Sequence, residues 1–265
     1  MILFWAVFKL NGSALNNWGD KYTDRELTGV AQQIGSKLVL TDTLTYKKDS
    51  VALYDGAFRI QKEDGKVIKV VDYPLYFRNV AKEKLPKEES KIYTWSANLS
   101  QSINPGWVIL LTPLVVAFFT FLRSRKKEPS TPTKIAFGLL ISALSVLVMV
   151  AAVHIGNNGA EKVSVWWLVA NYGVITIGEL FLSPMGLSVV SKLSPKNITS
   201  LMMGGWFLAT SIGNKLSGVL ASMWDSYENK ANFFWINFSL LLFATLLMFA
   251  LVKELNKVMK EKGIN

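Results

Sequence analysis

The segment from Ser164 to Val190 constrains the fold more than any other part of the chain. It reads SVWWLVANYGVITIGELFLSPMGLSVV, and Glu179 carries the only formal charge between Lys162 and Lys192. An apolar stretch of this length predicts a helix that crosses a membrane. A carboxylate inside such a helix is costly in lipid, so we expect Glu179 to face a protein interior or a water-filled cavity and to have a function. The alternative is a protonated or paired carboxylate that locks two helices together.

Five further apolar segments predict a polytopic membrane protein with six spans, because about half of the residues are apolar and gather in long runs. The first segment is short: eighteen helical residues rise about 27 Å, against a hydrocarbon core of about 30 Å. Either this span begins upstream in a longer protein, which we favour, or it is an unusually short helix. The predicted spans are Met1–Trp18, Ile103–Leu122, Lys134–Val153, Ser164–Val190, Thr199–Met223 and Phe233–Val252.

The net charge of +10 argues for membrane topology and not for nucleic-acid binding, because the cations gather in short segments beside the apolar runs. By the positive-inside rule, the ends of the second, fourth and sixth spans lie in the cytoplasm, and both termini are cytoplasmic. No signal peptide is visible at the apolar start MILFWAVF. The cations that set this orientation are Arg123, Arg125, Lys126, Lys127, Lys192, Lys196, Lys253, Lys257, Lys260 and Lys262.

The long polar region between the first two spans predicts a small extracytoplasmic, β-rich insertion. Its segments alternate apolar and polar residues around an Asp-Gly turn in EDGK. We interpret it as a solvated insertion, with an outer docking surface as the alternative. The predicted organisation is therefore residues 1–19 as the first transmembrane helix, truncated at its N-terminus, 20–98 as the insertion, and 99–265 as five further helices with a cytoplasmic tail.

The chain has no cysteine and a single histidine, His154. These counts exclude a disulfide framework, a thiolate metal site and a multi-histidine metal site. An intramembrane hydrolase would need a nucleophile and a base on facing helices, and His154 falls at a membrane edge. We therefore expect a protein that is not an enzyme and has no metal or cofactor, and an intramembrane enzyme remains the remote alternative.

One face of the fourth span carries the candidate site. Tyr172, Thr176, Glu179, Ser183 and Gly186 are spaced by 4, 3, 4 and 3 residues, so a helix places them on one side. Such a polar stripe is what a cavity wall requires. Pro184 predicts a kink beside it.

Neighbouring spans supply further candidates. Trp206 shares a face of the fifth span with Thr210, Gly213 and Ser217, and it is either a cavity or a lipid-facing residue. Lys9 in the first span is a second intramembrane charge and the natural partner of Glu179. A substrate ammonium could compete with a proton, or with Lys9, for the Glu179 carboxylate, which is a physical basis for proton coupling.

Four motifs resemble the proton-dependent oligopeptide transporter family of the major facilitator superfamily. GELFLSPMGLSVVSKLSPK and SLMMGGWFLATSIGNKLSG are similar to its tenth and eleventh helices, FWAVFKLNGSALNNW to its seventh and SINPGWVILLTPL to its eighth. The resemblance implies an all-α polytopic protein whose six transmembrane helices form the C-terminal half of a major-facilitator fold. The implied function is a peptide:proton symporter for di- and tripeptides that works by alternating access.

The resemblance also implies roles for individual residues. Glu179 resembles the glutamate that receives the amino terminus of the peptide, and Ser183, Trp206, Asn104 and Trp5 resemble residues of the substrate pocket. This chain has Lys9 and Leu10 where many members carry an acidic residue followed by Gln, so gating by Lys9 and Glu179 would differ from the usual scheme.

The implied partners are a di- or tripeptide substrate, the lipid bilayer and an N-terminal six-helix bundle. The proton is the coupling ion, and the expected location is a bacterial inner membrane. A non-transporting fragment, or a half-transporter that needs a separate N-terminal half, is the alternative.

Overall fold

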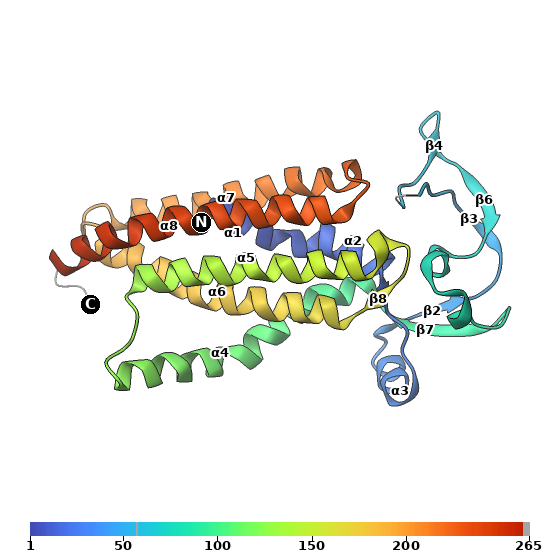
Figure 1. Cartoon of the computed structure of the whole chain (residues 1–265), viewed down its shortest axis with the longest axis horizontal. Coiled ribbons are helices and arrows are strands. Elements are labelled where there is room, and N and C mark those ends of the chain that lie inside the picture. Colours follow the sequence, from blue (N-terminus) through green and yellow to red (C-terminus); the bar gives the residue numbers. More distant parts are fainter. Residues whose placement is uncertain (57, 262–265) are drawn as a thin grey trace.

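In the computed structural model, which describes residues 1–56 and 58–261, long helices run side by side and a β-rich segment gathers at one end of them (Figure 1). Among the described residues, four helices are long and apolar enough to cross a membrane: 97–124, 131–155, 166–193 and 230–261. The long helices are α4 (Ser100–Ser124), α5 (Thr131–Ile155), α6 (Trp166–Leu193), α7 (Thr199–Ser222) and α8 (Lys230–Glu261).

These helices agree with five of the six predicted spans in place and type. Helix α7 occupies the predicted fifth span but is not among the four described helices that are long and apolar enough to cross a membrane, so the total of six transmembrane helices stays a prediction. Helix α6 continues through Pro184, and the kink predicted near that residue stays a prediction. The predicted cytoplasmic tail ends with residues 262–265, including Lys262, which lie outside the described residues.

The segment predicted as one helix over Met1–Trp18 is broken into two. Helix α1 (Ile2–Phe8) is followed by the 3-10 helix η1 (Lys9–Gly12) and then by α2 (Ala14–Lys21). The break falls where Gly12 and Ser13 weaken a helix, since glycine is flexible and a serine hydroxyl competes for backbone partners. Ser13 has non-helical angles (φ −134°, ψ −90°), and its hydroxyl donates to the Leu10 carbonyl at 3.4 Å.

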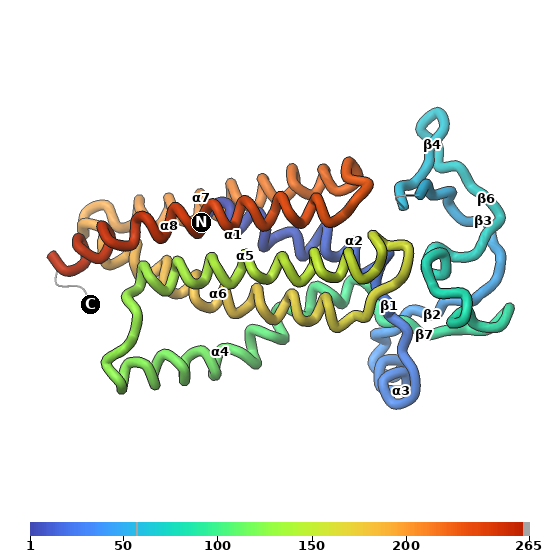
Figure 2. The backbone as a smooth tube through the Cα atoms, in the orientation of Figure 1, coloured from blue at the N-terminus to red at the C-terminus, as the bar shows by residue number. Residues whose placement is uncertain are grey.

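The core of the bundle lies around α5, which packs between α6 and α8. Glycines allow α5 and α6 to approach closely: a Cβ on Gly178 would lie 2.1 Å from Ser142 Oγ and 2.7 Å from the Gly138 carbonyl oxygen. Small residues at a helix crossing permit such contact, which is a main source of association energy inside a membrane. The tube in Figure 2 shows that the first residue lies partway along the bundle, whereas α8 ends at the end of the bundle that is far from the β-rich segment.

The β-rich segment comprises residues 23–96, of which residue 57 is not described. Its strands form small antiparallel pairs, β2 with β7, β3 with β6, and β4 with β5. The hairpin predicted around Asp64-Gly65 is present, and both turn residues have the positive φ values (49° and 77°) typical of such turns. The strands are β1 (Thr23–Asp24), β2 (Thr41–Thr45), β3 (Asp49–Ala52), β4 (Lys62–Glu63), β5 (Lys66–Val67), β6 (Lys69–Asp72), β7 (Lys91–Trp95) and β8 (Val163–Ser164).

The β-rich segment also contains helix α3 (Gly29–Lys37) and the 3-10 helices η2 (Leu75–Asn79) and η3 (Lys82–Lys84). Strand β1 pairs in parallel with β8 from the α5–α6 connection, so the segment is tied to the helix ends. Further ties come from the Asn79 side chain, which donates to the carbonyls of Lys21 and Gly159 at 3.0 and 3.1 Å. The remaining short 3-10 helices, all in connections, are η4 (Ala97–Leu99), η5 (Asn157–Gly159) and η6 (Trp224–Ser226).

Candidate functional site

A polar cluster joins α4 and α6 inside otherwise apolar helices. The Asn104 side-chain amide of α4 donates to Thr176 Oγ1 at 2.9 Å and to Glu179 Oε2 at 3.4 Å. Thr176 in turn donates to the Tyr172 carbonyl at 2.6 Å. Asn104 and Thr176 are buried, while Glu179 is partly exposed. The cluster therefore orients one carboxylate oxygen and leaves the group accessible.

The broken first helix lies beside this cluster. The Tyr172 hydroxyl of α6 donates to the Asn11 carbonyl at 3.2 Å, within the interruption between α1 and α2. Inside a membrane, a backbone carbonyl freed from a helix needs such a partner. Discontinuous helices of this kind form substrate and ion sites in many secondary transporters. The interruption is thus both stabilised by α6 and placed near its only acidic residue.

Lys9 and Trp5 lie on the α1 side of the same region. The Lys9 ammonium is exposed, lies 5.7 Å from the Trp5 ring centroid and 5.9 Å from that of Phe8, and interacts electrostatically with Glu179. No direct ion pair joins Lys9 and Glu179 in the described part of the chain. Lys9 thus adds positive potential without neutralising Glu179, which leaves the carboxylate able to interact with another cation.

The structure separates Trp206 from Glu179. The Trp206 ring packs directly on α6 at Gly186, where a Cβ would come within 1.9 Å of the indole. Gly186 is seven residues beyond Glu179, which corresponds to about 10 Å along the helix. Ser183 lies between them, and its buried hydroxyl has no hydrogen-bond partner among the described residues. Glu179, Ser183 and the Trp206 ring at Gly186 thus follow one another along the length of α6 and do not form one compact ring.

An apolar cavity of about 480 Å³ begins at Trp206 and extends towards the start of α1. Residues from α1, α5, α6, α7 and α8 line it, among them Met1, Leu139, Gly186, Trp206 and Met248. Helix α1 also packs closely on α7, because the Trp5 Cβ lies 2.6 Å from the position that a Cβ on Gly213 of α7 would take. Trp5 therefore lies between the Lys9 ammonium and the side of α7 that carries Gly213.

Several polar residues of the bundle were missed by the sequence interpretation. Trp107 of α4 donates its indole N–H to the Val169 carbonyl at 3.0 Å and packs on Gly173 of α6. The buried amides of Asn171 and Asn237 line a cavity of about 20 Å³ between α5, α6 and α8. Both asparagines stand out as polar residues within apolar runs, which is the signal that would have found them.

A charged cluster lies where the β-rich segment meets the bundle. The Lys162 ammonium lies 4.1 Å from the Tyr76 ring centroid and donates to the carbonyls of Lys21 and Thr23 at 3.3 and 3.4 Å. Burial, and secondly the charge of Arg25, lowers the pKa of Lys162 to about 7. Burial likewise raises the pKa of Tyr76, whose hydroxyl donates to Asp24 at 3.0 Å. This junction contains a group that titrates near neutral pH.

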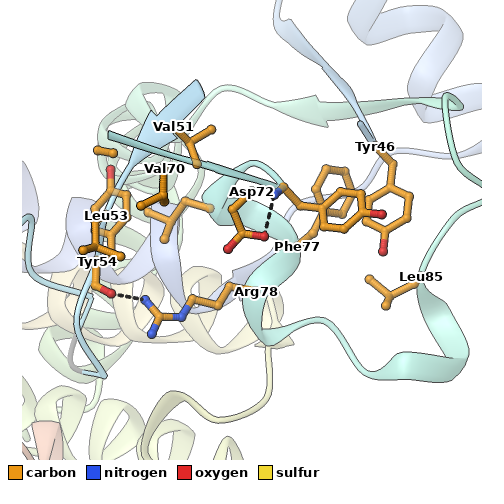
Figure 3. A pocket seen from close by; sticks show the side chains of 12 residues that line it. Tyr46, Val51, Leu53, Tyr54, Val70, Asp72, Phe77, Arg78 and Leu85 are labelled. Atoms are coloured by element: carbon orange, nitrogen blue, oxygen red, sulfur yellow. Dashed lines mark hydrogen bonds between the residues drawn. The ribbon is translucent and has the colours of Figure 1, made fainter. Parts of the chain in front are cut away.

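The β-rich segment has a pocket of its own, about 390 Å³ in volume, between the β3–β6 pair and η2 (Figure 3). The view shows aromatic and aliphatic walls with Asp72 and Arg78 between them. Arg78 is engaged, since it donates to the Tyr54 carbonyl at 3.1 Å. The pocket is separate from the cluster around Glu179. No group of three or more His, Cys, Asp or Glu side chains suited to a metal exists among the residues that the structure describes.

Comparison with known proteins places these features in a family. The model of the POT family (PTR2) matches residues 88–236. Similar curated proteins include dipeptide and tripeptide permease A of Proteus mirabilis, 36% identical over 132 residues (50% of this chain, 26% of the permease), and the peptide transporter YePEPT of Yersinia enterocolitica, 40% identical over 121 residues (45% and 24%). The aligned region thus spans about a quarter of the length of each relative.

Solved structures show the same fold. A crystal structure of the peptide transporter POT in complex with sulfate matches 98% of this chain and 39% of its own, with a TM-score of 0.63 at 24% identity. A POT family transporter in complex with 5-aminolevulinic acid matches 96% and 39%, with a TM-score of 0.63 at 22% identity.

Apolar helices of membrane-spanning length, a polar cluster around one acidic residue and a broken first helix define an integral membrane protein of the transporter class. The chain belongs to the POT family. Its relatives are transporters and not enzymes, as the sequence predicted.

Proposed function

We propose that this chain is the C-terminal six-helix half of a peptide:proton symporter that takes up di- and tripeptides. The proposal is supported by membership of the POT family and by relatives named as dipeptide and tripeptide permeases. The observation that carries it is the hydrogen-bonded cluster of Asn104, Thr176 and Glu179 beside the interruption of the first helix.

Glu179 receives the ammonium group of the peptide in this proposal. Its carboxylate is oriented by Asn104, is not ion-paired directly to Lys9, and lies among apolar helices where a cation is held strongly. A proton and a substrate ammonium cannot both occupy one carboxylate, so binding of one favours release of the other. Lys9 gates the exchange, because it attracts Glu179 when neither ligand is bound.

Ser183, Trp206 and Trp5 shape the remainder of the substrate pocket. Ser183 offers an unpartnered hydroxyl one turn beyond Glu179, and Trp206 offers an aromatic wall next to an apolar cavity. The order along α6, from acid to hydroxyl to apolar surface, suits a short peptide whose amino terminus lies at Glu179 and whose side chain points towards Trp206.

The second wall of the pocket comes from an N-terminal six-helix bundle, and the two bundles rock about the substrate in alternating access. Wide apolar surfaces on α4 and α7 support this part of the proposal, since Ile109, Leu114, Leu201 and Phe207 are 59–76% exposed. The expected location is the bacterial inner membrane, with both termini in the cytoplasm and the β-rich segment outside.

The test is dipeptide uptake driven by a proton gradient in liposomes that contain this chain together with its N-terminal bundle. Glu179→Gln should reduce uptake at least tenfold, an estimate of about 1.4 kcal/mol or more for a lost charge contact. Glu254→Gln, which changes an exposed carboxylate of α8, is the matched control and should leave uptake unchanged. Undiminished uptake by Glu179→Gln contradicts the proposal.

A second pair of variants tests the cluster and not only the charge. Asn104→Leu removes the amide that orients Glu179, so it should raise the KM for dipeptide and shift the pH dependence of uptake. Asn232→Leu replaces an exposed asparagine near the start of α8 and should change neither quantity. An equal effect of both variants would show that the amide of Asn104 has no special role.

A further inference from the structure

Helix α3 presents an apolar face that none of the described residues covers. Val30, Ile34 and Leu38 follow one another at intervals of four residues and are 70%, 54% and 61% exposed. Residues at this spacing share one side of a helix. The opposite side carries Gln32 and Ser36. This division into an apolar and a polar face is typical of helices that lie in a membrane interface.

The turn after α3 extends the apolar face at a cost in backbone strain. Val39 has φ +57°, in the left-handed region that β-branched residues rarely adopt, and its side chain is 87% exposed. The Leu40 amide donates to the Gly35 carbonyl at 2.9 Å, which closes this helix end. Glycine or asparagine would fit the backbone better. An apolar side chain here needs an apolar environment to offset both water exposure and strain.

Two strand pairs, one before α3 and one after it, hold α3 level with the ends of the transmembrane helices. Before α3, Asp24 pairs with Ser164, two residues ahead of the first residue of α6, Trp166. After α3, Thr41 pairs with Trp95, five residues ahead of the first residue of α4. Trp166 is 71% exposed, as expected for a tryptophan at the boundary between lipid and water. Helix α3 is thus held at the level of this boundary.

The orientation of α3 agrees with that depth. In Figures 1 and 2, α3 is seen nearly end-on, so its axis runs across the long axis of the bundle. It lies beside the bundle at the level of β1 and β8, whereas the hairpins β3–β6 and β4–β5 lie farther out. This direction is the one expected of a helix that runs along a membrane surface.

We propose that α3 is an interfacial helix that inserts Val30, Ile34, Leu38 and Val39 into the lipid leaflet at this end of the bundle. Its partner is the bilayer itself, and the apolar face would enter the headgroup and acyl boundary by about 5–10 Å. The β-rich segment is thereby anchored to the membrane at a point outside the transmembrane bundle.

The test uses a single environment-sensitive NBD label on the chain reconstituted in phosphatidylcholine liposomes. The chain contains no cysteine, so each introduced cysteine is its only thiol. Ile34→Cys should give blue-shifted emission that brominated lipids quench. Ser36→Cys, on the polar side of α3, should emit as in water. Val71→Cys is the matched control for exposed apolar residues, because Val71 is 76% exposed on β6 farther from the helices, and it should also report water.

Two results would overturn the proposal. Emission at position 34 that is red-shifted and quenched by iodide places α3 in water. Blue-shifted emission that bromolipids fail to quench places α3 against a protein surface, such as a second helical bundle.

A substitution provides an independent check. Ile34→Glu should return a label at position 38 to a water-like signal, while Ser36→Glu should leave that label in lipid. Far-UV circular dichroism verifies that both variants keep their helices. A label at position 38 that responds equally to both changes contradicts lipid insertion.

Discussion

Substitution of Gly178 by alanine tests whether the close contact between α5 and α6 positions Glu179. The added Cβ would lie 2.1 Å from Ser142 Oγ and 2.7 Å from the Gly138 carbonyl oxygen. The serine can rotate, but the carbonyl belongs to the helix backbone. Restoring ordinary van der Waals contact of about 3.4 Å or more requires α6 to move away from α5 by about 0.7 Å.

The cost of this movement outweighs the gain in helix propensity. Overpacking of a close contact costs about 1–3 kcal/mol, and the shift weakens contacts along the whole α5–α6 interface. Alanine in place of glycine gains about 1 kcal/mol in helix propensity. Gly106→Ala on α4 is the matched control, because a Cβ there meets nothing within 4 Å. We expect Gly178→Ala to be about 1–3 kcal/mol less stable than Gly106→Ala, because the gain in helix propensity is common to both variants.

The assay is thermal unfolding in detergent, followed by circular dichroism, together with uptake by the assembled transporter. Gly178→Ala should lower Tm, while Gly106→Ala should leave it unchanged or raise it. Because Glu179 follows Gly178 directly, uptake should fall as well. A Gly178→Ala protein with the Tm and uptake of the wild type would refute the claim that this contact is tight.

Three further predictions concern groups outside the polar cluster. The pKa of Lys162 is about 7 in the folded protein, against 10.5 for an ordinary lysine. Between pH 7 and pH 10.5 the folded state has released this proton while the unfolded state still binds it, so the stability of the protein rises with pH over this range. Lys162→Met should raise Tm at pH 6 and flatten the rise in Tm towards pH 9. The pKa of Glu128 is lowered to about 2, chiefly by its hydrogen bond with Arg123. The ionised Glu128 therefore stabilises the folded protein at pH values above its unfolded pKa of 4.5, and this stabilisation is lost as the pH falls towards 2. Glu128→Gln should therefore cost about 1 kcal/mol at pH 7, allowing for solvent screening, and the Tm difference should vanish in acid. Trp107→Phe keeps an aromatic ring packed against α6 but loses the hydrogen bond to the Val169 carbonyl. Unfolding in detergent should therefore show that the free energy of unfolding falls by about 1 kcal/mol.

Apolar periodicity was sufficient to predict most helices, because a helix in lipid must satisfy its own backbone and its length is set by the bilayer. The five predicted spans from residue 103 onwards each correspond to a long helix. The first span was predicted less well. The residues that weaken the helix, Gly12 and Ser13, are visible in the sequence, but the hydrogen bond that the Tyr172 hydroxyl donates to the Asn11 carbonyl comes from a residue far away in the chain.

The same distinction applies to the site. A lone acid in an apolar span singles out Glu179 from the sequence, because an unpaired charge in lipid is expensive. Periodicity within one helix also places Thr176 and Ser183 on its side. The distance between Trp206 and Glu179 depends on how α7 crosses α6, and no pattern within either helix contains that information.

The sequence by itself determined the membrane class, the family and the residue that carries the buried charge, because these follow from local composition and from short motifs. Only the tertiary structure decided that Asn104 reaches Glu179, that Trp206 packs on Gly186, and that the strand before α3 pairs with the strand before α6. These are contacts between segments distant in sequence, and their geometry is fixed by packing and strand pairing that no single segment specifies.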